Sequence, residues 1–148
     1  MNQITDILPM HQGSIAAIDV GDTRIGVALA SKAARLPRPY STLINDAKIW
    51  VNLRQIFAQN AVDMVIMGLP QNSSGQDTDQ TKKTRKFGQK LEDNLSVTVE
   101  WQDEALSSKR AKNELISRGK TFDKAEVDSL AATLILEDYL KEQSIRSI

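Results

Sequence analysis

Cysteine is absent from this chain of 148 residues, and histidine occurs only once, at His11. Without cysteine there is no disulfide, no zinc–thiolate site and no cysteine nucleophile. A Ser-His-Asp triad would have to use His11, which lies in a polar N-terminal stretch and is more simply interpreted as a solvated residue. Any catalysis must therefore rest on carboxylates, hydroxyls, lysine, arginine or a metal held by oxygen ligands.

Long apolar runs and an excess of either charge are also missing. No run approaches the roughly 20 residues that span a bilayer, and residues 1–14 lack the basic and apolar regions of a signal peptide. We therefore expect a soluble, cytoplasmic protein with no membrane partner. The 19 basic and 19 acidic residues balance, which argues against a strongly basic nucleic-acid coat but leaves room for a local basic patch.

The length suits a single domain. We expect this domain over residues 15–141, after a flexible N-terminal segment (1–14) and before a C-terminal tail (142–148). Hydrophobic periodicity and turn residues predict an order β-β-β-α-β-α-β-α-α. The predicted strands are 15–20, 25–31, a short third strand within 35–43, 62–67 and 96–102, and the predicted helices are 46–60, 78–94, 107–117 and 124–141. This order indicates an α/β fold in which a hairpin opens a mixed five-stranded sheet flanked by helices.

Acidic residues fall at the ends of several predicted elements. Asp19 lies near the end of the first strand, Asp103 and Glu104 follow the strand 96–102, and Asp128 lies near the start of the last helix. If the first strand is central, and the strands 62–67 and 96–102 run parallel to it, these acids meet at one edge of the sheet. Converging carboxylates repel one another, and a divalent cation relieves the repulsion. Oxygen ligands favour Mg²⁺ or Mn²⁺.

Each acid also has a structural interpretation. Asp19 could cap the turn in "DVGDT", while Asp103, Glu104 and Asp128 could simply favour the positive N-terminal ends of helices. Only their shared position at one edge of the predicted sheet favours a metal site.

Other polar and flexible residues near this edge are candidates for substrate binding. Gly21 leaves room beside Asp19 for metal or phosphate, and Arg24 is either a phosphate contact or a surface residue of the hairpin. The loop "GLPQNSSGQ" is either a phosphate- or sugar-binding loop or a plain connection, and the basic face of the helix 78–94 could follow a phosphate backbone or simply face solvent. The candidates from these two segments are Asn72, Ser73, Gly75, Lys82, Lys83 and Arg85.

Four segments in this order resemble the YqgF/RuvX family: "AIDVGDTRIGVALA", "VIMGLPQNSSGQ", "QDEALSS" and "EVDSLAATLILEDYL". This family comprises candidate pre-16S rRNA nucleases that are also described as Holliday junction resolvases. The resemblance extends from about residue 15 to residue 140. It implies a ribonuclease H-like fold and metal-dependent cleavage of a nucleic-acid phosphodiester, with the family's acids at Asp19, Glu104 (beside Asp103) and Asp128.

The expected mechanism is hydrolysis assisted by one or two Mg²⁺ or Mn²⁺ ions. Asp19 would bridge the ions, with Glu104 and Asp128 completing the ligands; one ion would activate water and the other would stabilise the leaving oxygen. The resemblance implies that the partner is nucleic acid, RNA rather than DNA, with ribosomal particles as a further partner. A resolvase that cuts two strands symmetrically should be a homodimer, whereas an rRNA-trimming enzyme can be a monomer.

The chain departs from the family pattern in one motif. The family's Asp-Glu-Arg-Leu-Ser/Thr-Thr reads "DEALSS" here, so Ala105 replaces the arginine. The better-known junction resolvases also carry an acid after the fourth strand, and no acid occurs here until Asp77.

Two alternatives of other classes stay open. The pattern of apolar run, Asp-x-Gly and turn also occurs in ATP-binding proteins of the actin, sugar kinase and chaperone type, but these need about twice this length. The Ala105 replacement would also allow a catalytically silent nucleic-acid- or protein-binding module.

Overall fold

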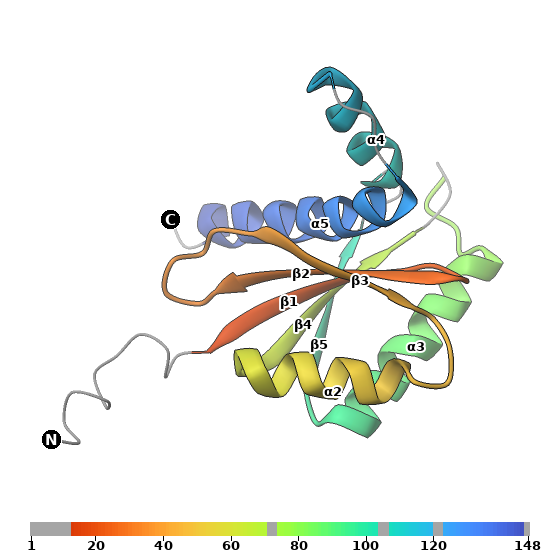
Figure 1. Cartoon of the computed structure of the whole chain (residues 1–148), viewed down its shortest axis with the longest axis vertical. Helices are drawn as coiled ribbons and strands as arrows, with labels where there is room; N and C mark the ends of the chain where they lie inside the picture. The colour runs from red at the N-terminus through yellow and green to blue at the C-terminus, as the bar shows by residue number, and fades with distance from the viewer. Residues whose placement is uncertain (1–12, 71–73, 104–106, 120–122, 147–148) are drawn as a thin grey trace, which may run out of the picture.

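The computed structural model describes residues 13–70, 74–103, 107–119 and 123–146. They form five strands and four helices in the predicted order (Figure 1). The strands are β1 (Ser14–Val20), β2 (Arg24–Ser31), β3 (Arg38–Ile44), β4 (Val62–Leu69) and β5 (Thr98–Asp103). The helices are α2 (Ile49–Asn60), α3 (Asp79–Leu95), α4 (Ser107–Ser117) and α5 (Lys124–Arg146), so the last helix extends beyond its predicted end at residue 141.

The sheet is mixed, with strand order β3-β2-β1-β4-β5. β1 pairs antiparallel with β2 and parallel with β4, and β4 pairs parallel with β5. The central position of β1 and the parallel direction of the later strands are therefore confirmed. The carboxyl ends of three neighbouring parallel strands meet at one edge, where ligands bind in open α/β sheets.

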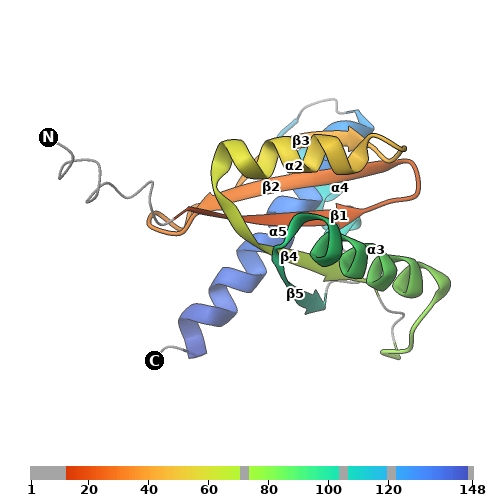
Figure 2. The ribbon, with the colours of Figure 1, turned by 90° about the horizontal axis from the view of Figure 1, so that it is seen from below.

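The two faces of the sheet pack against different helices. α2 and α3 cover one face and α5 covers the other (Figures 1 and 2). Alternation along β1 explains this arrangement: Ala16 and Ile18 join the core under α2 and α3, while Ile15 and Ala17 pack under α5. Since both faces of β1 are buried, the strand is apolar on both sides until it reaches Asp19.

α5 is buried on two sides. Ala132, Ile135, Leu136, Tyr139 and Leu140 pack against the sheet. A second set packs with Ala111 and Leu115 of α4: Val127, Leu130, Ala131 and Leu134. α4 thus covers the outer side of α5 (Figure 1), a contact between helices that the sequence does not reveal. No helix among the described residues is long and apolar enough to cross a membrane.

Candidate active site

Asp19 lies at the carboxyl end of β1 and on the side of the sheet that α5 covers. Alternation gives it the same face as Ile15 and Ala17, which pack under α5. Its cross-strand neighbour on β2 is Gly26. Asp19 is therefore half-buried at the end of the strand, between the sheet and the first turns of α5.

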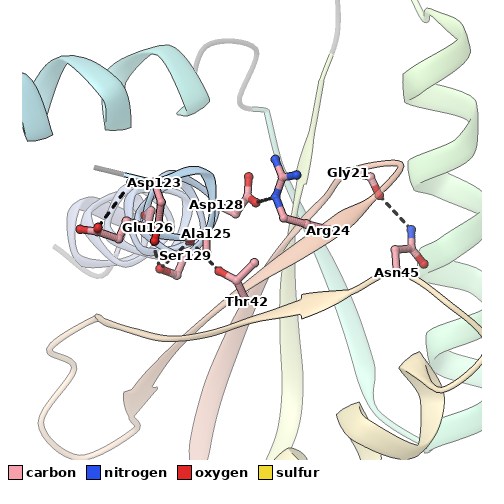
Figure 3. Close-up of polar contacts among 9 residues, drawn as sticks. All are labelled: Gly21, Arg24, Thr42, Asn45, Asp123, Ala125, Glu126, Asp128 and Ser129. Carbon is pink, nitrogen blue, oxygen red and sulfur yellow. Dashed lines mark hydrogen bonds and ion pairs between the residues drawn. The ribbon is translucent and has the colours of Figure 1, made fainter. Parts of the chain in front are cut away.

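Gly26 allows α5 to approach the sheet beside Asp19. A Cβ atom at Gly26 would lie 2.0 Å from the backbone oxygen of Asp128 and 3.0 Å from the backbone nitrogen of Ser129. The backbone of α5 thus rests directly on β2, which glycine alone permits. A second contact fixes the start of the helix, since Thr42 Oγ1 of β3 donates to the backbone oxygen of Ala125 at 2.6 Å (Figure 3).

The environment of Asp19 favours its protonated form. Burial, with a further contribution from the negative charge of Asp128, raises the pKa of Asp19 from 3.8 to about 6. The strands and α5 therefore hold together two carboxyl groups that repel each other. A carboxyl group with a raised pKa beside a second carboxylate is a candidate functional group, because a bound cation would remove the repulsion between the two.

Asp128 is paired with Arg24. The Arg24 Nε atom of β2 donates to Asp128 Oδ2 at 2.5 Å, and the two side chains are 31% and 17% exposed (Figure 3). From the sequence, Arg24 was either a phosphate contact or a surface residue of the hairpin. In the structure it holds the carboxylate of Asp128 beside Asp19, a role that the sequence did not suggest.

The turn after Asp19 is fixed from several directions. The Gly21 backbone N–H donates to the backbone oxygen of Arg24 at 2.9 Å, and the backbone oxygen of Gly21 accepts from Asn45 Nδ2 at 2.8 Å (Figure 3). Gln80 Nε2 of α3 donates to the backbone oxygen of Val20 at 3.2 Å. A Cβ atom at Gly21 would lie 2.7 Å from the backbone oxygen of Arg24, so glycine is required there. Sequence reasoning missed Asn45 and Gln80; the position of Asn45 directly after β3 was the only available signal.

Asp103 ends β5 and is exposed. Along β5, Glu100 accepts from Tyr139 Oη at 3.0 Å and Gln102 donates to Glu142 at 3.1 Å, so these two residues face α5. The ring of Trp101 instead packs over Gly88 of α3. Strand alternation places Asp103 on the side of Trp101 and thus does not favour it as a ligand beside Asp19. The neighbouring candidate, Glu104, lies outside the described residues.

The predicted substrate-binding residues are dispersed. Lys83 of α3 lies 3.5 Å from Asp22 in the turn after β1, so it is near the site. Arg85 instead pairs with Asp77 at 3.2 Å, and Lys82 is exposed. Gly75 has a positive φ of 78° and open space around it. His11, Asn72 and Ser73 lie outside the described residues.

The donor set at the edge suits a hard divalent cation. Asp19 and Asp128 supply carboxylate oxygens, the ligands that Mg²⁺ and Mn²⁺ prefer. Within the described residues there is no group of three or more acids or histidines placed to hold a metal. Of the predicted metal residues, Asp19 and Asp128 lie near each other at this edge, Asp103 lies on the other side of β5, and Glu104 lies outside the described residues.

The order of the elements and of the strands is that of a ribonuclease H-like fold. Two solved structures support this fold: Thermus thermophilus RuvC in complex with a Holliday junction substrate (TM-score 0.54, 15% identity, covering 87% of this chain and 96% of that chain) and Thermus thermophilus RuvC alone (TM-score 0.54, 17% identity, 88% and 96%).

Sequence comparison assigns the family. The model of the RuvX family, described as Holliday junction resolvase, matches residues 13–142, and the chain belongs to this family. A relative from Actinobacillus succinogenes is 33% identical over 133 residues, covering 87% of this chain and 95% of that protein. Another from Caldanaerobacter subterraneus is 35% identical over 139 residues, covering 87% and 96%. Both are named as candidate pre-16S rRNA nucleases. The resemblance found in the sequence is thus confirmed.

Proposed function

We propose that this protein is a metal-dependent nuclease that hydrolyses phosphodiester bonds in precursor 16S rRNA. The observation that carries the proposal is the pair of carboxyl groups at the carboxyl edge of the sheet, where burial and Asp128 raise the pKa of Asp19 to about 6. The names of the curated relatives support the substrate. The cytoplasm stays the predicted location, with ribosomal particles as predicted partners.

The residues of the site have different proposed roles. Asp19 and Asp128, together with Glu104, would hold Mg²⁺ or Mn²⁺, while Asp103 is the less favoured ligand. When bound, a divalent ion lowers the pKa of a water nucleophile and stabilises charge on the leaving oxygen. Arg24 orients the carboxylate of Asp128 through its 2.5 Å contact, and Asn45 and Gln80 hold the turn that follows Asp19. Gly21, Lys82, Lys83 and Arg85, with Asn72, Ser73 and Gly75 of the loop, remain the proposed substrate contacts.

A second candidate is the resolution of four-way DNA junctions. The description of the matching family model favours it, as does the fold shared with RuvC. Against it stands the absence of an acid between the end of β4 and Asp77. We therefore propose RNA rather than DNA as the preferred substrate.

Metal binding can be tested separately from cleavage. We expect Mn²⁺ to raise the melting temperature of the protein, because an ion that binds only the folded state stabilises it by mass action. Asp19→Asn should abolish this rise, whereas Asp22→Asn, which changes an exposed acid in the adjacent turn, should keep it. An equal response to Mn²⁺ in the wild type and in Asp19→Asn would contradict the proposed site.

A further inference from the structure

A basic groove lies between the start of α2 and the exposed side of α3. It has a volume of about 300 Å³, and its walls include Asn45, Asp46, Trp50, Lys83, Lys86 and Lys90. We call it the α2–α3 groove. It lies on the side of the sheet opposite α5, since α2 and α3 share that face (Figure 2).

Three lysines line the groove from one side of α3. Lys83, Lys86 and Lys90 are spaced at i, i+3 and i+7, so they share a face of the helix and extend over about 10 Å along its axis. Lys86 and Lys90 form no ion pair with any described residue, and Lys83 makes only a long contact of 3.5 Å with the exposed Asp22. Asp46 is the one carboxylate among the lining residues, and its Oδ1 accepts from the backbone N–H of Lys48. The groove is thus a site of net positive charge with free ammonium groups.

The groove leads to the candidate active site. Lys83 at its near end contacts Asp22, which lies three residues after Asp19. Asn45, which also lines the groove, donates to the backbone oxygen of Gly21 in the same turn (Figure 3). A chain bound along the lysines would therefore continue to the edge of the sheet where Asp19 lies.

The groove also contains an aromatic wall. Trp50 of α2 stacks on Phe87 of α3, with 4.9 Å between the ring centroids and an angle of 26° between the rings, and both residues line the groove. Lysines that follow a backbone, combined with an aromatic surface for bases, are the features that bind single strands. A duplex hides the faces of its bases and gains nothing from the aromatic wall.

We propose that the α2–α3 groove binds the single-stranded stretch of RNA that flanks the bond to be cut. Lys83, Lys86 and Lys90 contact neighbouring phosphates, and Trp50 contacts a base. Of the basic residues suggested by the sequence, Lys83 lines this groove; Lys86 and Lys90 line it with Lys83, whereas Lys82 and Arg85 are not among its lining residues. This inference rests on the proposed function for the choice of RNA as ligand, but binding in the groove needs neither metal nor cleavage.

The test measures binding of a short uridine-rich RNA in the presence of a chelator, as a function of salt. For a single strand, each lost phosphate contact lowers the slope of log K against log salt by about 0.7, so Lys86→Gln/Lys90→Gln should lower it by about 1.4. The same relation predicts a loss of affinity of about 25-fold at 0.1 M salt that disappears toward 1 M. In a Trp101→Phe background, the remaining Trp50 fluorescence should change on binding.

The control removes the same charge elsewhere. Lys32→Gln/Lys141→Gln changes one lysine after β2, at the far end of the sheet from Asp19, and one in the second half of α5. We expect this variant to keep the wild-type affinity and slope. Equal binding by wild type and the groove variant, equal losses in the groove and control variants, or a duplex that binds as tightly as the single strand would each overturn the inference. None of these outcomes affects the Mn²⁺ response of Asp19, so failure of the groove and failure of the nuclease proposal are distinguishable.

Discussion

The ionised carboxyl group of Asp19 lowers the stability of the folded protein. Its pKa is raised to about 6, first by burial and then by the charge of Asp128. The folded state therefore binds a proton more tightly than the unfolded chain does, and the free energy of unfolding falls as the pH rises from about 4 to about 6. Below about pH 4, Asp19 is protonated in both the folded and the unfolded state. Above about pH 6, the loss of unfolding free energy is complete.

Replacing Asp19 by asparagine should stabilise the protein at neutral pH. Asparagine removes the half-buried negative charge, and the shift in the pKa of Asp19 corresponds to about 2–3 kcal/mol of unfolding free energy. For a domain of this size we expect a rise in melting temperature of about 4–10 °C at pH 7.5, and almost none at pH 3.5. Thermal unfolding followed by circular dichroism at both pH values tests this.

Asp22→Asn provides the matched control, because its side chain is 69% exposed in the next turn. Its free energy of unfolding should change by less than about 0.5 kcal/mol at either pH. Asp19→Asn would contradict the argument if it destabilised the protein at pH 7.5, or stabilised it equally at both pH values.

Arg24 should contribute more to stability than an exposed arginine does. Arg24→Gln leaves the partly buried Asp128 without its cation, which we expect to cost about 1–2 kcal/mol of unfolding free energy. Arg118→Gln removes a more exposed pair with Glu114, whose side chains are 49% and 39% exposed, and should cost about 0.3–0.5 kcal/mol. Urea unfolding measures both, and an equal cost would remove the positioning role that we assign to Arg24.

At the scale of elements, the site depends on how closely α5 and α3 approach the sheet. α5 rests on β2 at Gly26 and is bonded to β3 through Thr42. α3 starts at a capping box in which Thr78 and Thr81 bond each other's backbone N–H groups, and Thr81 Oγ1 also donates to the backbone oxygen of Pro70. Both helices are thus fixed at the ends nearest Asp19.

Gly26→Ala should separate α5 from the sheet. The added Cβ would lie 2.0 Å from the backbone oxygen of Asp128, and neither the strand nor the helix backbone can yield without losing contacts. We expect a loss of about 3 kcal/mol or more in unfolding free energy, together with a loss of the Mn²⁺ response.

Gly119→Ala is the control for that substitution. Its surroundings are open and only its positive φ of 71° opposes a side chain, so the expected cost is about 1 kcal/mol. If Gly26→Ala were no more costly in urea unfolding than Gly119→Ala, direct contact between α5 and β2 would be excluded.

Thr78→Ala should weaken the start of α3. Loss of the capping hydroxyl is expected to cost about 1 kcal/mol. It should also weaken RNA binding, because Gln80 and Lys83 in the following turns contact the chain after Asp19. Thr78→Ser keeps the hydroxyl and should retain most of the stability in urea unfolding. A serine variant as unstable as the alanine variant would show that the hydroxyl is not the stabilising group.

At the scale of the whole molecule, periodicity predicted the order of the elements well. The apolar strands β1 and β4 and the long helices have strong patterns, and the position of β1 at the centre followed from its two apolar faces. The same reasoning placed Asp19 and Asp128 at one edge, because strand ends and helix starts are visible in the sequence.

Features that depend on contacts between distant segments could not be predicted in this way. In the sequence, Gly26 is one more small residue of β2. In the structure it lies opposite Asp19, and the absence of a side chain there allows α5 to pack directly on the sheet. The pairing of Arg24 with Asp128 joins residues 104 positions apart. Which basic residues of α3 line the α2–α3 groove depends on which side of the helix faces α2, and a helix with several lysines does not reveal this.

The most direct test of the nuclease proposal is a cleavage assay. Precursor 16S rRNA ends and a four-way DNA junction would be incubated side by side with Mg²⁺ or Mn²⁺, using wild type, Asp128→Asn and the exposed control Asp22→Asn. We expect wild type and the control to cut the rRNA precursor in preference to the junction. Asp128→Asn should be slower by more than about a hundredfold, since even loss of a group that only supports a metal ligand costs about 10–100-fold. Failure of the wild type to cut either substrate with either metal, or equal cleavage by wild type and Asp128→Asn, would contradict the proposed active site.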